Sequence, residues 1–398
     1  EGAQPDFSAA QKFTGRFSMS TNAPEYLLHK ATATGLIPGV TYAFRVGDAK
    51  LNLWSQTGTF TTDNRDGSFS FINLADSQAK SAEEAELAAD TFVIAHDTVK
   101  GADFMVLNGD VVDTGMKEEE WGWLMDAASK AFFNLPFMAV SGNHDEDNQS
   151  FYEHFNLEPA EGSATKSGAY YSFDYENTHF IMLNTNEDSP EYANFTPRQI
   201  GWLKADAAAA RERGVDWQIA VMHKGPYTTS NHATDDDIMK ENGVRTLVAP
   251  ILAQLGIDLV LQGHDHIYAL SKPINEKGEA QEPVMVEIQH NDTLIKHMEN
   301  PQGVVYMIPN TAGPKVYYKN KAILESDAAF YDKFVYAQEN SAAKYATQAD
   351  AGRPPRSIIQ NFVELHVSPE RISAVVYEID RNQGAAPYVL DSFGIVKK

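Results

Sequence analysis

The chain is 398 residues long, which exceeds the size of most single hydrophobic cores, so we expect two or more structural units. Its hydrophobic share of 43% and charged share of 22% are ordinary for a globular protein. No apolar run reaches the ~20 residues that a membrane span needs. The net charge of −23 argues against nucleic-acid backbones and anionic membranes as partners. Phosphate chemistry would need local positive charge, and bound metal is its obvious source.

The chain has no cysteine, which excludes disulfides and thiolate metal sites. Histidine, aspartate, glutamate, asparagine and glutamine remain as possible metal ligands. No signal peptide is recognised at Glu1, so we expect either a cytosolic protein or a mature, processed one. The absence of cysteine fits an exported bacterial protein.

Residues 1 to about 62 have a β-rich pattern. The stretch from Leu36 through Pro38 and Gly39 to Tyr42 reads Leu-x-Pro-Gly-x-x-Tyr and enters an alternating strand, which is typical of the tyrosine corner of a β-sandwich. Such a sandwich usually takes about 100 residues, so its leading strands are missing or irregular. We therefore predict a partial fibronectin-III-like module at residues 1–65, which serves either as a spacer or to gate substrate.

A polar, turn-rich linker at residues 63–67 precedes an alternation of strands and helices, the pattern of a mainly parallel α/β core. We predict helices starting at Ser81 and spanning residues 117–133 and 197–213, and a β-hairpin at 170–175 and 179–184. Further strands are expected at 284–288, 304–308, 362–367 and 372–379. Residues 322–356 are Ala-rich and polar, and form either a helix or a long excursion.

Five apolar, strand-like runs end in residues of metal-ligand type. In open α/β sheets, ligands bind at the carboxyl ends of the strands. One such ending means little, but five in chain order indicate a single site. The runs and the residues that follow them are 71–75 with Asp76, 105–107 with Asp110, 137–140 with Asn143 and His144, 219–222 with His223, and 259–261 with His264 and His266.

Together with Gln78, these residues supply the ligands of a dinuclear metal site. Two metal ions about 3.5–4 Å apart need a bridging carboxylate and several nitrogen or oxygen ligands each. Residues two apart on an extended strand tip, as in Asp76-x-Gln78 and His264-x-His266, face the same side.

The order Asp-x-Gln, Gly-Asp-x-x-Asp, Gly-Asn-His-Asp, a lone His and Gly-His-x-His resembles the calcineurin-like metallophosphoesterase superfamily. The preceding β-module and the sequence at residues 263–268 are similar to its purple acid phosphatase branch. The resemblance covers residues 27–273 and more loosely the C-terminal strands. It implies an α/β fold, a metallophosphoesterase-type sandwich of two mixed sheets flanked by helices, with the catalytic domain at residues 66–398.

The resemblance also implies two divalent or trivalent metal ions, of iron, manganese or zinc. It implies metal-dependent hydrolysis of a small phosphorylated substrate, with a metal-bound hydroxide attacking phosphorus in line. The ligands carried over by motif are Asp76, Gln78 and His266 for the first metal, Asn143, His223 and His264 for the second, and Asp110 as the bridge.

Two further residues take roles by the same resemblance. His144 would face the substrate, as proton donor to the leaving oxygen or as phosphate clamp. Asp113 would accept a hydrogen bond from His144 and fix its tautomer. Family members usually have histidine where Gln78 stands, so the first metal is expected to bind less tightly or to be a different ion. Purple acid phosphatases have a metal-binding tyrosine at the position of Asp113, so we expect no purple colour.

Several neighbouring residues have more than one interpretation. Asp265 is a turn residue or supports the ligands, Lys224 and Tyr227 touch substrate or are loop side chains, and Tyr268 lines the pocket or packs beneath it. The remaining histidines lack the motif spacing and are interpreted as structural or surface groups: His29, His96, His154, His179, His232, His290, His297 and His366.

The rival hypothesis is a non-catalytic binding or adhesion protein on a degenerate phosphoesterase scaffold, which only Gln78 supports. Among enzymes, phosphomonoester, phosphodiester and nucleotide substrates all stay open, as does the oligomeric state. The cysteine count and the family resemblance together favour an extracellular or cell-surface location for a bacterial protein in its mature form.

Overall fold

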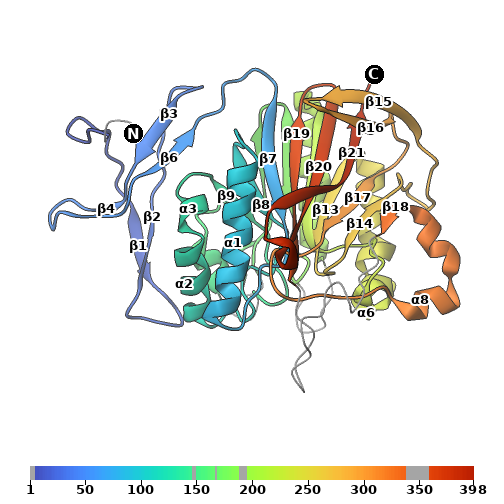
Figure 1. Cartoon of the computed structure of the whole chain (residues 1–398), viewed down its shortest axis with the longest axis horizontal. Helices are drawn as coiled ribbons and strands as arrows, with labels where there is room; N and C mark the ends of the chain where they lie inside the picture. Colours follow the sequence, from blue (N-terminus) through green and yellow to red (C-terminus); the bar gives the residue numbers. More distant parts are fainter. Residues whose placement is uncertain (1–4, 146–148, 166–167, 188–194, 338–357) are drawn as a thin grey trace.

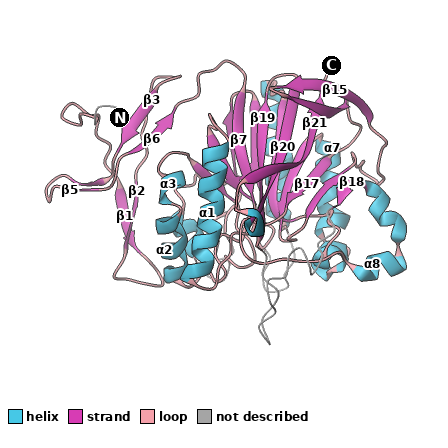
Figure 2. Ribbon diagram, viewed as in Figure 1, coloured by secondary structure: helices cyan, strands magenta, loops and turns pink. Residues whose placement is uncertain are grey.

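Two β-sheets face each other at the centre of the molecule, with helices on both outer sides (Figures 1 and 2). This computed structural model describes residues 5–145, 149–165, 168–187, 195–337 and 358–398. The main hydrophobic core lies between the sheets and contains side chains from both, such as Phe71 and Leu365 from one and Ile219 and Leu261 from the other. The predicted α/β sandwich of two mixed sheets is confirmed.

The first sheet has eight strands. Strands β7, β8 and β9, at one side of the sheet, are parallel, whereas β19, β20 and β21 pair antiparallel, so the sheet is mixed. Helices α1, α2 and α3 lie on its outer side (Figure 1). The strands in spatial order are β15 (Val284–His290), β16 (Thr293–Glu299), β21 (Pro387–Val396), β20 (Arg371–Asp380), β19 (Ile359–Val367), β7 (Phe69–Leu74), β8 (Phe104–Leu107) and β9 (Phe137–Ala139).

The second sheet has seven strands, of which β11, β12, β13 and β17 are parallel. Strand β12 is buried along its whole length, with Ile219 and Val221 facing the core between the sheets and Ala220 and Met222 facing the outer helices. Burial on both faces explains why these strands read as continuous apolar runs. Their spatial order is β10 (Tyr171–Tyr175), β11 (Thr178–Met182), β12 (Trp217–Lys224), β13 (Leu259–Gly263), β17 (Val305–Pro309), β14 (Tyr268–Ser271) and β18 (Phe334–Ala337).

The helices begin and end at residues with capping chemistry. The Ser81 side chain accepts a hydrogen bond from the Glu84 N–H, and Pro197 follows the Thr196 cap, both as predicted. The predicted helix at 117–133 is interrupted at Ala128, which separates α2 from α3. The helices are α1 (Ala82–Thr98), α2 (Glu118–Ala127), α3 (Ser129–Phe132), α4 (Ser150–His154), α5 (Pro197–Arg213), η1 (Asn231–Thr234), α6 (Asp236–Met239), η2 (Val244–Val248), α7 (Ala249–Leu255), α8 (Lys321–Ser326), η3 (Ala328–Lys333) and η4 (Arg381–Gln383).

The predicted hairpin is confirmed as β10 and β11, with Glu176 at a φ of 49° in the turn. The predicted strands after residue 273 correspond to β15, β17, β19 and β20. The stretch 322–356 begins with α8, η3 and β18, and its remainder from 338 lies outside the described residues. Among the described residues, no helix combines the length and the apolar character of a membrane span.

The N-terminal segment forms three separate antiparallel pairs rather than one continuous sheet. The Tyr42 hydroxyl accepts a hydrogen bond from the Ile37 N–H at 2.8 Å, which is the geometry of the expected tyrosine corner. Phe17 and Met19 are exposed, so a packed sandwich core is not seen in the described part of this segment. The fibronectin-III-like module and its boundary at residue 65 stay predictions. The pairs are β1 (Arg16–Met19) with β2 (Leu27–Lys30), β3 (Thr41–Phe44) with β6 (Gly58–Thr61), and β4 (Gly47–Asp48) with β5 (Leu53–Trp54).

Candidate metal centre

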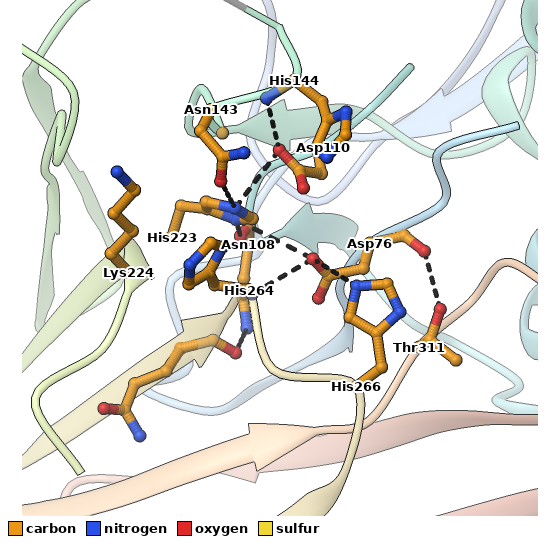
Figure 3. Close-up of polar contacts among 12 residues, drawn as sticks. Asp76, Asn108, Asp110, Asn143, His144, His223, Lys224, His264, His266 and Thr311 are labelled. Atoms are coloured by element: carbon orange, nitrogen blue, oxygen red, sulfur yellow. Dashed lines mark hydrogen bonds and ion pairs between the residues drawn. The ribbon is translucent and has the colours of Figure 1, made fainter. Parts of the chain in front are cut away.

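The residues predicted from the strand ends lie together at one end of the two central sheets (Figure 3). Each sheet contributes part of the cluster, because the strands that carry the residues belong to both. Asp76, Asp110 and the Asn143–His144 pair follow β7, β8 and β9, His223 lies in β12, and His264 and His266 follow β13.

Three of these residues have a left-handed backbone although none is glycine. The φ angles are 56° for Asp76, 50° for Asp110 and 71° for His264. Such conformations cost about 1–3 kcal/mol each and occur preferentially at functional sites. The surrounding fold therefore holds these side chains in place against local strain.

Two glycines in the motifs are required by close packing. A Cβ atom on Gly142 would lie 2.0 Å from Oδ1 of Asp110, and one on Gly109 would lie 2.5 Å from Nδ1 of His223. The strand ends can therefore approach the ligand side chains only because no side chain is present at these positions.

The inner part of the cluster is formed around His223. Its Nδ1 donates to the main-chain oxygen of Asn108 at 2.8 Å, which leaves Nε2 to face the site. Nε2 lies 3.2 Å from Oδ1 of Asp110 and 3.1 Å from Oδ1 of Asn143. Ligand atoms of Asp110, His223 and His264 all lie within 4.8 Å of one another, so this group could hold a metal ion.

The charges in this group stabilise one another. Burial by itself raises the pKa of Asp110, but the neighbouring His223 and His144 outweigh it and hold that pKa well below its usual range. Burial likewise lowers the pKa of His223, but the Asp110 carboxylate outweighs it and raises the pKa to about 9. The Asp110 carboxyl group is therefore ionised and can bind a metal cation.

A second part of the cluster is formed around Asp76. Its Oδ1 accepts the His264 N–H at 3.1 Å and lies 3.4 Å from Nε2 of His266, whose Nδ1 donates to the main-chain oxygen of Lys315. Its Oδ2 is buried and has no hydrogen-bond partner among the described residues. A buried carboxylate oxygen without a partner is unfavourable unless a cation satisfies it. The residues present therefore fit a metal ion at this point.

Gln78 lies between Asp110 on one side and His144 and Lys315 on the other. In the amide orientation that satisfies its hydrogen bonds, its nitrogen donates to Oδ2 of Asp110 at 2.9 Å. Its oxygen then accepts from Nε2 of His144 and Nζ of Lys315, both at 3.1 Å. Rotation of the amide by half a turn presents the oxygen beside the Asp110 carboxylate, which is the orientation of a metal ligand.

His144 lies at the edge of the cluster, where a quarter of its side chain is exposed. Its Nδ1 is 2.8 Å from the main-chain oxygen of Asp113 and 3.6 Å from Oδ1 of that residue. The structure therefore brings His144 and Asp113 together as predicted, but the hydrogen-bond acceptor is the main chain rather than the carboxylate. In either case Nδ1 is engaged and Nε2 faces inward.

The other residues weighed from the sequence have structural partners. Lys224 forms an ion pair with Asp237 at 2.9 Å, and Tyr227 is buried. The buried Tyr268 donates its hydroxyl hydrogen to Asp391, which places it beneath the site rather than in it. Oδ1 of the buried Asp265 accepts the main-chain N–H of His232, so this carboxylate supports the loop that carries η1.

Two residues at the cluster were missed by the sequence interpretation. The His232 ring stacks on His264, with ring centroids 3.9 Å apart, and its Nδ1 lies 2.6 Å from Oδ2 of Asp235. Lys315 reaches His144 and Gln78 from the loop that follows β17. Neither residue directly follows a strand or matches a motif, so the sequence carries no signal for them.

The comparisons with known proteins agree with the fold and with the motifs. Residues 71–268 match the family model of the calcineurin-like phosphoesterases, and this part of the chain is a calcineurin-like phosphoesterase domain. Purple acid phosphatase 18 of Arabidopsis thaliana is 29% identical over 194 residues, which cover 46% of this chain and 42% of the relative. Purple acid phosphatase 23 of the same plant is 25% identical over 274 residues, covering 61% and 57%. The chain thus spans about half the length of these relatives.

Solved structures show the same fold. Purple acid phosphatase PPD1 from yellow lupin seeds superimposes with a TM-score of 0.71 at 15% identity, covering 99% of this chain and 68% of that one. The structure of PhoD gives a TM-score of 0.63 at 14% identity, covering 95% and 79%. At these low sequence identities, the structural similarity supports the fold alone.

Proposed function

We propose that the protein is a metal-dependent phosphoesterase that hydrolyses the phosphate esters of small molecules at a dinuclear metal site. The observation that carries this proposal is the convergence of ligand atoms from both sheets: Asp110, His223 and His264 are grouped, and Oδ2 of Asp76 has no hydrogen-bond partner among the described residues. The similarity to purple acid phosphatases supports the reaction class.

The residues sort into two metal positions. Asp76, Gln78 and His266 would hold the first ion, Asn143, His223 and His264 the second, and Asp110 both. Ions of this kind supply a water-derived nucleophile at neutral pH and neutralise charge on the phosphoryl oxygens. The neutral oxygen of Gln78 is a hard ligand, and the set lacks thiolates, which suits iron, manganese or zinc ions.

His144 is proposed to donate a proton to the leaving oxygen. The bond from Nδ1 to the Asp113 main-chain oxygen holds the ring with Nε2 toward the cluster. A protonated Nε2 near the scissile ester oxygen lowers the barrier by neutralising the alkoxide or phenoxide as it departs. Asp113 therefore positions the ring rather than contacting substrate.

The proposal is tested with an aryl phosphate monoester and a bis-aryl diester, each supplied with Mn²⁺, Zn²⁺ or Fe²⁺. Metal-dependent release of the phenol that a chelator abolishes would establish the enzyme, and the faster substrate would define its class. Absence of turnover on both esters with every metal would contradict the proposal and favour the non-catalytic binding protein.

A further inference from the structure

Lys315 is one of the two residues at the site that no motif accounts for. It lies in the loop between β17 and α8, and its main-chain oxygen accepts the hydrogen bond from Nδ1 of His266 at 2.8 Å. The backbone of Lys315 is therefore tied directly to a proposed metal ligand. The hydrogen bond fixes the position of the Lys315 backbone, and the side chain extends from there to the cluster.

The ammonium group of Lys315 contacts an amide oxygen, an imidazole nitrogen and an aromatic ring. Nζ lies 3.1 Å from the oxygen of Gln78, 3.4 Å from Nε2 of His144 and 5.2 Å from the centroid of the Tyr317 ring. An amide oxygen and an aromatic face both orient a cation without cancelling its charge. The position of the Lys315 ammonium group is therefore defined, and its positive charge is available to bind an anion.

Other lysines nearby are neutralised by carboxylates. Nζ of Lys80 lies 3.6 Å from Asp113 and that of Lys224 lies 2.9 Å from Asp237. Lys315 forms no ion pair with a carboxylate in the part of the chain that the structure describes. In a protein with a net charge of −23, an uncompensated cation beside His144 points to an anionic ligand at this point.

We propose that Lys315 binds a non-bridging phosphoryl oxygen of the substrate and makes the enzyme selective for phosphate monoesters over diesters; this rests on the proposed function. A monoester carries about 1.5 to 2 negative charges at neutral pH, whereas a diester carries one. The Coulomb energy scales with the product of the charges, so a fixed ammonium favours the monoester. The contact with the Tyr317 ring orients the ammonium group for this role.

The test compares three variants of the full chain loaded with metal. Lys315→Met keeps the length of the side chain and removes the charge, whereas Lys315→Arg keeps a positive charge. Lys319→Met is the matched control, because it removes a charge from the same loop, where Nζ lies 4.6 Å from the Tyr331 ring centroid. Metal content and thermal unfolding of each variant show whether fold and ligands are preserved.

We expect Lys315→Met to lower kcat/KM for the aryl monoester about 10- to 100-fold and to change kcat/KM for the diester by less than about threefold. Lys315→Arg should recover most of the loss, and Lys319→Met should behave as the wild type. Equal losses on both esters, or a loss of bound metal in Lys315→Met, would overturn the assignment of Lys315 to monoester selectivity.

Binding of inorganic phosphate by calorimetry separates this inference from the proposed function, because it needs no turnover. Lys315→Met should weaken phosphate binding about 10-fold or more relative to the wild type. Equal affinities would overturn the role of Lys315 whether or not the protein hydrolyses esters. Absence of hydrolysis together with a Lys315-dependent phosphate affinity would overturn the proposed function but support the anion site.

Discussion

Asp110 combines burial, charge and a strained backbone in one residue. Its Oδ1 accepts the His144 N–H at 2.9 Å and lies beside His223. The hydrogen bond depends on the shape of the side chain, and the interaction with His223 depends on its charge. An asparagine at this position would keep the shape and remove the charge. Substitution of Asp110 by asparagine therefore tests the proposed metal bridge directly.

We expect Asp110→Asn to lose bound metal and to reduce turnover by more than the about 10- to 100-fold typical of residues that only support ligands. Metal content by elemental analysis and the ester assay would measure both effects. Asp126→Asn, on the exposed side of α2, is the control and should retain both. Full metal content and activity in Asp110→Asn would refute the bridging role.

His144→Ala should keep the metal content of the wild type, because the ring is assigned to the substrate rather than to a metal. Turnover should fall by about 10²- to 10⁴-fold, the usual contribution of a general acid. The loss should shrink as the leaving group becomes more acidic, since a good leaving group needs less protonation. A loss of the same size for alkyl and nitrophenyl esters would argue against proton donation.

At the scale of the elements, the ends of the strands decide whether the site can form. Gly142→Ala places a methyl group against Asp110, so we expect a loss of about 1–3 kcal/mol in the free energy of unfolding together with weaker metal binding. Gly122→Ala in the middle of α2 meets no atom within 4 Å and should instead stabilise the protein by about 0.5–1 kcal/mol. Denaturant unfolding of both variants measures the contrast, and similar effects would contradict the packing argument.

A second element-scale prediction concerns the junction of β10, β11 and α5. Burial lowers the pKa of His179 from 6.5, but hydrogen bonds to Asp206 and Asp174 outweigh it and raise the pKa. A raised pKa in the folded state stabilises the fold below pH 6.5, and this contribution disappears as the pH rises through the folded pKa. His179→Gln should therefore destabilise the protein more at pH 5.5 than at pH 9, a comparison made by denaturant unfolding. An equal effect at both pH values would exclude the charged pair.

The sequence predicted the elements whose signals are local. Alternation, capping and strand-end motifs located α5, the β10–β11 hairpin and the strand-end residues such as Asp76, Asp110 and His264 that lie together in Figure 3. The sequence did not predict features that depend on tertiary contacts. The break at Ala128 has no glycine or proline to announce it, and Lys315 and His232 reach the cluster only through the course of long loops.

At the scale of the whole molecule, the candidate site joins the two sheets. Asp76 and Asp110 belong to the first sheet, and His223, His264 and His266 to the second. A ligand that binds only the folded state stabilises it according to its concentration and affinity. Metal binding should therefore stabilise the contact between the sheets, and not merely a surface loop.

We expect a metal concentration of about one hundred times Kd to raise Tm by about 3 °C, and a chelator to reverse the change. Thermal unfolding followed by circular dichroism measures this shift. His223→Ala should show a much smaller shift, whereas His29→Ala, on the exposed side of β2, should match the wild type. A shift of unchanged size in His223→Ala would place the stabilising metal elsewhere.

The left-handed backbones of Asp76, Asp110 and His264 have a consequence for engineering and for evolution. Glycine adopts such conformations without strain, so a search for stabilising substitutions that considers the backbone alone would select glycine at all three positions. Each of those changes would delete a proposed ligand. The backbone strain is therefore tied to the proposed ligands, and attempts to stabilise the protein should hold these three residues fixed.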